Sequence, residues 1–175
     1  METWRLKAKA ITKYNPKNFN SEGVYLLDEW TSRADIGKKI DSYTGVTLSK
    51  ERYLQVENNY IKSVRVFVKN LKVKKIRIKE FYYISNLEDF EENNDKDLYE
   101  YFKSLESKVY DVEEIENIVR LALREYIQVE IKLITPDETD AVIHFGYDYY
   151  MYFVCDTLDF NWLQKKLNDF QMFVT

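Results

Sequence analysis

The hydrophobic pattern of the chain changes period several times along its length. Segments in which apolar and polar residues alternate, or in which short apolar runs are bounded by turn residues, predict half-buried strands. These strands are expected over residues 4–10, 23–30, 76–84, 127–133, 141–145 and 149–155. The last two flank Gly146-Tyr147-Asp148 and predict an aromatic hairpin.

Other segments have the spacing of amphipathic helices. The longest runs from a capping Ser49 to about Leu71, with apolar residues three and four apart. Shorter helices are expected over 31–40, 98–105, 111–125 and 160–170, the third starting with a capping-box-like Asp111 and Glu114. Residues 86–97 are expected to form an acidic connector.

The order of these elements lacks the regular strand–helix alternation of a parallel doubly wound fold. We therefore expect an α+β fold, a mainly antiparallel sheet of about five to six strands with helices packed chiefly on one face. No linker or repeat divides the chain, so residues 1–175 are expected to form a single globular domain.

Composition narrows the class of protein. Apolar residues make up 45% of the chain and charged residues 32%, and no apolar run reaches the roughly 20 residues that a membrane span requires. The N-terminus has no apolar signal core. Cys155 is the single cysteine, so an internal disulfide cannot form. These features predict a cytoplasmic protein that does not enter a membrane.

Charge is divided unequally along the sequence. Residues 1–80 carry 18 Lys and Arg against 9 Asp and Glu, whereas residues 81–175 carry 8 against 21. Such a division predicts a basic and an acidic side if the two halves lie apart in space. The alternative is that the halves interleave and their charges pair across the fold.

Residues that carry catalytic chemistry are scarce. His144 and Cys155 could form a Cys–His pair across the last hairpin, or be structural residues. One His and one Cys cannot supply a structural zinc site, and no glycine-rich phosphate loop is present. The acids at 137–140 and 88–92 lack the spacing of an EF-hand and are expected to be solvated. We therefore expect no catalytic residue, no cofactor and no metal, and hence no enzyme.

Nucleic acid is also an unsuitable partner. Alternating basic residues occur at Arg5, Lys7 and Lys9 and at Arg77 and Lys79, but the residues between them are apolar and expected in the core. A sequence pI of about 5.2 further opposes binding to phosphates.

Protein-binding surface remains as the main candidate. Tyrosines at 147–152 cannot all be buried unless the hairpin is covered on both faces, and tyrosine is enriched in binding hot spots. The acids at 88–97 and 111–116 would attract a basic partner, unless they are only a solvated face. The candidate partner-binding residues are Glu88, Asp89, Glu91, Glu92, Asp95, Asp111, Glu113, Glu114, Tyr147, Asp148, Tyr150 and Tyr152.

Two stretches of the sequence resemble the immunity proteins of bacterial polymorphic-toxin and contact-dependent growth inhibition systems. They are Asp28-Glu29-Trp30-Thr31-Ser32-Arg33-Ala34-Asp35-Ile36-Gly37 and the hairpin Phe145-Gly146-Tyr147-Asp148-Tyr149-Tyr150-Met151-Tyr152 before a short final helix. The resemblance implies a catalytically inert protein that binds a cognate toxin domain, frequently a nuclease, and blocks it. A homo-oligomeric interaction module is the alternative, and an enzyme that uses carboxylates and tyrosines is a third hypothesis.

Overall fold

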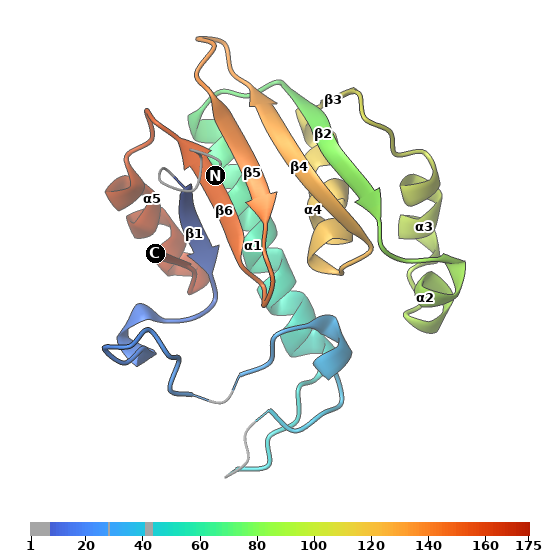
Figure 1. Ribbon diagram of the computed structural model, residues 1–175, viewed down its shortest axis with the longest axis vertical. Coiled ribbons are helices and arrows are strands. Elements are labelled where there is room, and N and C mark those ends of the chain that lie inside the picture. The colour runs from blue at the N-terminus through green and yellow to red at the C-terminus, as the bar shows by residue number, and fades with distance from the viewer. Residues whose placement is uncertain (1–7, 28, 41–43) are drawn as a thin grey trace.

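The computed structural model describes residues 8–27, 29–40 and 44–175, drawn in Figure 1. The strands are β1 (Ala8–Thr12), β2 (Lys75–Tyr83), β3 (Val109–Asp111), β4 (Ile127–Ile134), β5 (Ala141–Phe145), β6 (Met151–Cys155) and β7 (Phe173–Val174). The α-helices are α1 (Lys50–Asn70), α2 (Leu87–Glu92), α3 (Lys96–Lys103), α4 (Ile115–Leu123) and α5 (Phe160–Leu167).

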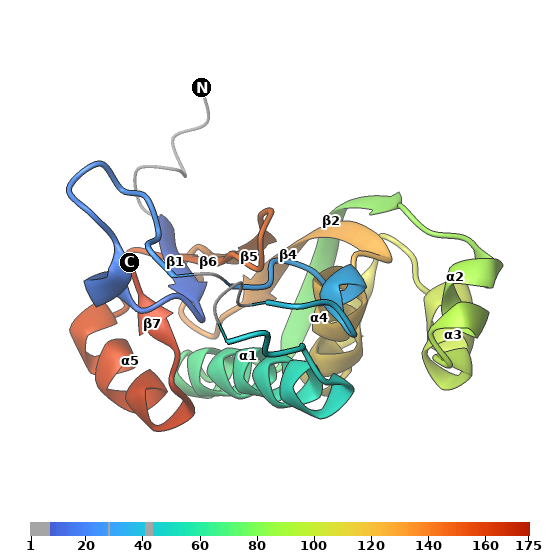
Figure 2. The same cartoon turned by 90° about the horizontal axis from the view of Figure 1, so that it is seen from below.

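The described strands form one antiparallel sheet in the order β3-β2-β4-β5-β6-β1-β7. Figure 2 shows α1, α4 and α5 on one side of this sheet, while α2 and α3 lie beyond the β2 side. The α+β prediction is thus confirmed. The sheet has seven strands, more than the five to six expected. The sequence pattern did not reveal β3 and β7, because three and two residues are too few to show a period.

Helix α1 forms where it was expected, because Ser49 caps it and its apolar residues share one face. The Ser49 hydroxyl accepts a hydrogen bond from the Arg52 N–H, which satisfies one free donor of the first turn. Phe67 projects from α1 onto Phe153 of β6, and the two fully buried rings stack with centroids 4.1 Å apart. Among the described helices, none is both long and apolar enough to cross a membrane.

The segment between β1 and α1 was predicted wrongly. The described residues of 23–30 form no strand, and Val24, Leu26 and Leu27 are more than half exposed. The helix expected over 31–40 is only a 3-10 turn, Arg33–Asp35. Gly37 then takes a positive φ of 85° and pairs with Leu48 through the backbone, so the chain turns back instead of continuing as a helix.

The acidic connector expected over 86–97 was also wrong, because it contains α2. The Asn86 side chain accepts hydrogen bonds from the Glu88 and Asp89 N–H groups, and Asp89 accepts one from the Asn86 N–H. Asp111 makes no such cap and leads through a 3-10 turn into α4, which ends at Leu123. The first part of the strand expected over 4–10 lies outside the described residues.

The two halves of the chain interleave in the sheet. β1 lies between β6 and β7, and β2 lies between β3 and β4. Ion pairs therefore join the halves, as between Lys75 and Asp111 at 2.8 Å. The charge division seen in the sequence does not make two separate sides of the molecule.

Candidate functional site

The turn between β5 and β6 is strained. Asp148 and Tyr149 both take positive φ, 54° and 63°, and the Tyr150 N–H donates to the Tyr147 carbonyl at 3.1 Å. This is the pattern of a type I′ turn, which normally carries Asn and Gly at these positions. A bulky residue such as Tyr149 costs of order 1–3 kcal/mol there, so other contacts must hold the turn.

Burial of Tyr149 supplies those contacts. Its ring lies 4.9 Å from Trp30 and 5.7 Å from Tyr60, centroid to centroid. Its hydroxyl donates to the Tyr53 hydroxyl, and its carbonyl accepts a hydrogen bond from the Tyr60 hydroxyl. The hairpin tip is therefore fixed to α1, which orients the exposed residues on either side of Tyr149.

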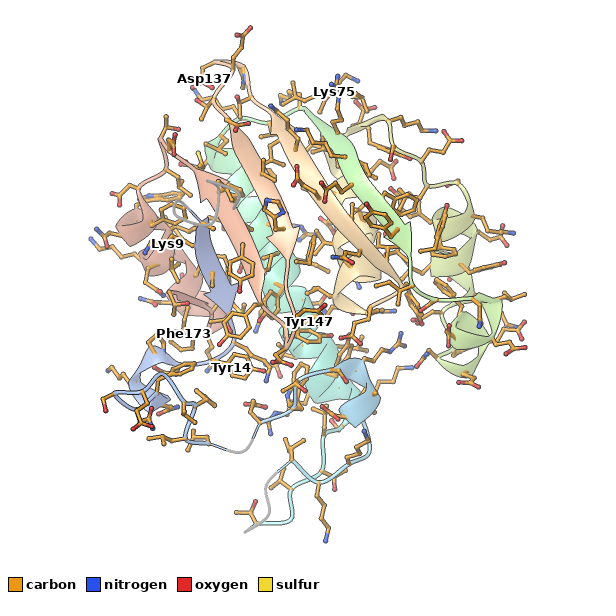
Figure 3. All side chains as sticks on the ribbon, in the orientation of Figure 1. Lys9, Tyr14, Lys75, Asp137, Tyr147 and Phe173 are labelled. Atoms are coloured by element: carbon orange, nitrogen blue, oxygen red, sulfur yellow. The ribbon has the colours of Figure 1, made fainter. Side chains whose placement is uncertain are left out.

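Aromatic rings continue from this hairpin across the β1–α1 connection. Successive ring centroids are 4.9–6.3 Å apart, and most of the rings are half-buried. Tyr147 at the tip is 91% exposed, and Figure 3 shows it at the same end of the sheet as Tyr14. We call this set the tyrosine surface: Phe19, Tyr25, Tyr14, Tyr150, Tyr152 and Tyr147.

The tyrosine surface contains a hollow of about 220 Å³, lined in part by Tyr14, Tyr25, Leu27 and Tyr150. Asp148 is exposed beside it. Gly146 allows the rings to pack, because a Cβ there would lie 2.8 Å from Tyr152 Cε2. Four of the twelve residues predicted from the sequence are thus brought together here.

The predicted acids of 88–95 divide into surface and internal residues. Glu88, Glu91 and Glu92 are exposed on α2 and make no ion pair within the described part of the chain. Asp89 is committed to the helix cap. The Asp95 side chain is only 9% exposed and belongs to an internal network.

That network joins Glu57, Arg120, Arg124, Asp95 and Arg33. Glu57 of α1 is fully buried and accepts two hydrogen bonds from Arg124, at 2.6 and 2.7 Å. Arg124 also pairs with Asp95 at 2.8 Å, and Asp95 accepts a hydrogen bond from Arg33. Residues 29–40, which we call the strap, are in this way tied to α1 and to the end of α4.

Lowering the pH is expected to reduce the free energy of unfolding, because it protonates Asp95. Burial by itself would raise the pKa of this carboxyl, but the hydrogen bond from Arg33 and the charge of Arg124 outweigh it and lower the pKa. The stabilisation is therefore complete above the unfolded-state pKa and is lost as the pH falls from roughly 5 through the lowered value. Urea unfolding between pH 6 and pH 3 should show a flatter decline for Asp95→Asn than for the wild type.

Asp111→Asn is the control for that experiment, because Asp111 is an exposed acid in a surface ion pair. Because a solvated ion pair contributes only about 0–1 kcal/mol, Asp111→Asn should alter the decline of stability less than Asp95→Asn does. Equal slopes for the wild type and Asp95→Asn would show that Asp95 does not couple folding to pH.

The second predicted acidic cluster lies far from α2. Asp111 pairs with Lys75 at the start of β2, and α2 follows the other end of that strand. Nine strand residues separate the two ends by roughly 25–30 Å. Glu113 is exposed and Glu114 is half-buried, both near the Asp111 end. The two acidic clusters therefore do not form one patch.

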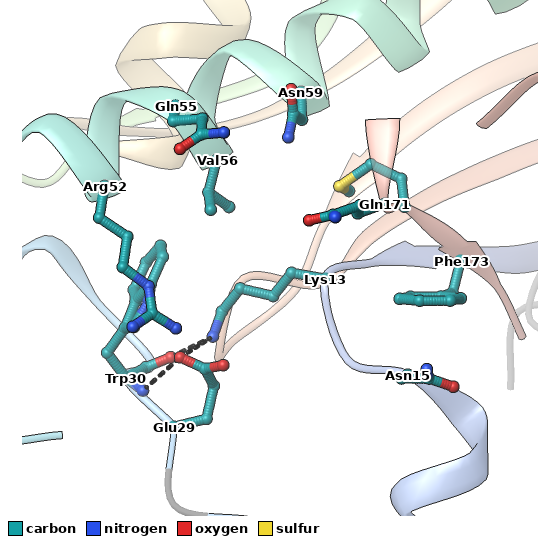
Figure 4. Close-up of a pocket in the computed structure, with 11 residues that line it drawn as sticks. Lys13, Asn15, Glu29, Trp30, Arg52, Gln55, Val56, Asn59, Gln171 and Phe173 are labelled. Carbon is teal, nitrogen blue, oxygen red and sulfur yellow. Dashed lines mark hydrogen bonds and ion pairs between the residues drawn. The ribbon is translucent and has the colours of Figure 1, made fainter. Parts of the chain in front are cut away.

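A polar pocket of about 420 Å³ lies between α1, the strap and β7 (Figure 4). Arg52, Gln55 and Asn59 project into it from successive turns of α1, and Lys13 lies opposite them. The Lys13 ammonium donates to the Trp30 carbonyl at 2.6 Å and pairs with Glu29 at 3.2 Å. It also lies 4.3 and 4.1 Å from the centroids of the Tyr14 and Trp30 rings.

The Lys13 amine is held in an unusual environment. Burial, assisted by the charge of Arg52 and opposed by that of Glu29, lowers its pKa to about 8. Its side chain is 6% exposed. A lysine placed in this way has a larger fraction of neutral amine near neutral pH than a solvated one.

His144 and Cys155 do not form a pair. In the antiparallel register His144 is opposite Tyr152, whereas Cys155 is opposite Ala141, so the two side chains lie on opposite faces of the sheet. His144 Nδ1 lies 3.4 Å from Glu130 Oε2, and Cys155 is buried. Within residues 8–27, 29–40 and 44–175, no group of three or more His, Cys, Asp or Glu side chains could hold a metal ion.

Sequence reasoning missed the pocket residues and the network. Gln55 and Asn59 follow Arg52 by three and seven residues, which indicates a polar stripe on α1. This spacing does not indicate that the strap covers the stripe.

Comparisons of this chain with protein-family models, with curated proteins and with solved structures find no match.

Proposed function

We propose that this chain is a non-catalytic protein that binds a cognate toxin domain through the tyrosine surface and neutralises it. The observation that carries the proposal is the row of rings, half-buried apart from the buried Tyr14, beside a strained, firmly anchored turn. Tyrosine offers a large contact area and a hydroxyl at a low cost in conformational entropy. Backbone strain also concentrates at binding sites.

The surroundings of this surface favour a protein over a nucleic acid or a small ligand. Leu26 and Leu27 are 63% and 56% exposed, next to the tyrosines along the chain. The hollow of about 220 Å³ is smaller than the roughly 300–1,000 Å³ of ordinary ligand pockets and would suit one side chain of a partner. Among the described residues, Glu29 and Asp148 line it and no Lys or Arg does, which opposes phosphate binding.

The charge of the exposed acids suggests the chemistry of the partner. Asp148 lies on the tyrosine surface, and Glu88, Glu91 and Glu92 are exposed on α2. Such acids accelerate encounter with a basic protein and suppress association with acidic ones. A basic nuclease toxin, as the resemblance to immunity proteins implies, would have this complementary charge.

Replacing Tyr150 with alanine is expected to weaken partner binding by about 2 kcal/mol or more, roughly 30-fold in Kd. The reason is that Tyr150 contacts both Tyr14 and Tyr152 and so holds the centre of the tyrosine surface together. The tagged wild type would first capture the partner from a lysate of the source strain. The affinity of the purified partner for each variant would then be measured by calorimetry.

Tyr82→Ala is the matched control, because Tyr82 is a 60% exposed tyrosine on β2, away from the tyrosine surface. It should keep the wild-type affinity. Equal affinity for Tyr150→Ala and the wild type would refute the proposed surface. Self-association of the wild type in sedimentation, with no captured partner, would instead favour the homo-oligomeric module.

A further inference from the structure

In the pocket of Figure 4, the Lys13 amine lies opposite side chains that can bind a carboxylate. Arg52, Gln55 and Asn59 enter it from one face of α1, because they are three and seven residues apart on the helix. Lys13 forms part of the opposite wall, with Glu29 at 3.2 Å from its nitrogen. The cavity, about 420 Å³, lies within the range of small-molecule sites.

The two walls of the pocket differ in chemistry: one offers hydrogen-bond donors for a carboxylate, and the other offers an amine beside a carboxylate. An arginine guanidinium binds a carboxylate through two parallel hydrogen bonds, and the amides of Gln55 and Asn59 can donate to further oxygens. A buried lysine amine is a nucleophile toward carbonyl carbon, and a neighbouring carboxylate can take and return its proton. Both features point to a ligand that carries a carboxylate and a carbonyl group next to each other.

We propose that Lys13 forms an imine with a small 2-oxo carboxylate bound in this pocket, whose carboxylate pairs with Arg52. The inference depends only on the pocket and is independent of the proposed binding of a toxin.

The covalent step balances without any further reactant. The neutral Lys13 nitrogen attacks the ligand's carbonyl carbon, and one of its two N–H protons passes through Glu29 to the former carbonyl oxygen to give a carbinolamine. Glu29 then takes the second N–H proton and delivers it to the hydroxyl group as that group departs. One water molecule leaves, a C=N bond replaces the C=O bond, and nothing is oxidised or reduced.

The pocket explains why Lys13 would be preferred over the other lysines of the chain. The charges around it are those of Glu29 and Asp35, which favour the ammonium, and Arg52, which opposes it. Burial also favours the neutral amine, and the pKa of Lys13 is lowered to about 8. A solvated lysine, with a pKa near 10.4, has far less neutral amine at the same pH.

Reductive trapping tests the proposal on the full chain. The protein would be incubated with pyruvate, reduced with sodium borohydride, and analysed by intact mass and peptide mapping. The expected result is a single adduct at Lys13 whose rate of formation rises with pH and is half-maximal near pH 8. Arg52→Gln should raise the half-saturating pyruvate concentration about tenfold or more, because the charged hydrogen bonds to the carboxylate are lost.

Two controls make the outcome decisive. Lys13→Arg should abolish the adduct, and circular dichroism would show that it folds. Lys132→Arg, at a half-exposed lysine outside the pocket, should leave the adduct unchanged. Hydroxyacetone, which has the carbonyl but no carboxylate, should label Lys13 far more weakly than pyruvate does. Adducts spread over the exposed lysines without enrichment at Lys13 would overturn the proposal. Equal trapping of pyruvate by Arg52→Gln and by the wild type would also overturn it.

Discussion

Arg124→Met is expected to lower the free energy of unfolding by about 3–5 kcal/mol, because it removes one partner of a buried ion pair. Arg124 is 9% exposed and makes two hydrogen bonds to Glu57, whose side chain is fully buried. Without the guanidinium, the partners that Glu57 keeps among the described residues are Arg120 at 3.1 Å and, at a longer 3.4 Å, the Tyr53 hydroxyl. Urea denaturation measures the loss.

Arg65→Met is the matched control. Arg65 also makes two hydrogen bonds to one carboxylate, that of Glu116, but its side chain is 60% exposed. A solvated ion pair contributes only about 0–1 kcal/mol. The double variant Glu57→Met with Arg124→Met should recover part of the stability, since it also removes the fully buried Glu57 carboxylate that Arg124→Met leaves with fewer partners. Equal losses for Arg124→Met and Arg65→Met would contradict the importance of burial in this network.

Phe67→Ala is expected to cost about 3–5 kcal/mol, because it opens a cavity where α1 packs on the sheet. Phe67 and Phe153 are both fully buried and stack with an interplanar angle of 8°. For a chain of this size the loss corresponds to a fall of roughly 6–20 °C in Tm. Calorimetric unfolding would measure it.

Phe67→Leu separates the loss of volume from the loss of an apolar contact. It keeps most of the apolar volume and should cost less than about 1.5 kcal/mol. Lys69→Ala, at an exposed position two residues further along α1, should change stability by less than about 0.5 kcal/mol. A Phe67→Ala cost no larger than that of Phe67→Leu would show that this contact is not central to the core.

Regular periodicity made much of the sheet and α1 predictable. β4 alternates strictly, and the eight residues from Ile127 to Ile134 follow that pattern in their burial. α1 has both a cap and an apolar stripe. In each of these elements the local preference and the burial in the fold agree, which is the condition under which sequence reasoning succeeds.

The strap and the internal network could not be predicted, because contacts distant in sequence determine them. The residues of the Arg33–Asp95 pair are 62 positions apart, and those of the Arg124–Glu57 pair are 67 apart. The segment 23–30 has the composition of a strand, but Trp30 is the only one of its described residues that is buried, and it packs against Tyr53 and Tyr149. Short edge strands such as β7 have too few residues to show a period.

The candidate site could be predicted only in part, because some of its residues lie in a regular hairpin and others lie in a connection without a regular pattern. The half-buried Tyr150 and Tyr152 follow from alternation in the hairpin, and the exposure of Tyr147 follows from its place in the turn. Tyr14 and Tyr25, which extend the tyrosine surface, come from a connection with no regular pattern. In the sequence, nothing distinguishes Asp95 from the glutamates just before it, which are exposed on α2. Its burial is explained by its ion pairs with Arg33 and Arg124 in the folded chain.

The strap connects the two regions to which we assign roles. Trp30 packs on Tyr149 beneath the tyrosine surface, and its carbonyl accepts the hydrogen bond from Lys13 in the pocket. Glu29 lines both hollows. Through Arg33 and Asp95 the strap is fixed to the internal network. Loosening that network would therefore be expected to disturb both regions together.

Titration of a captured toxin domain tests the central claim most directly. The activity of the purified toxin would be measured as this protein is added in increasing amounts. We predict that activity falls linearly to a minimum at one protein per toxin, and that Tyr150→Ala shifts the curve to higher concentration while Tyr82→Ala does not. Full toxin activity at a large excess of the wild-type protein, or equal inhibition by Tyr150→Ala, would contradict neutralisation through the tyrosine surface.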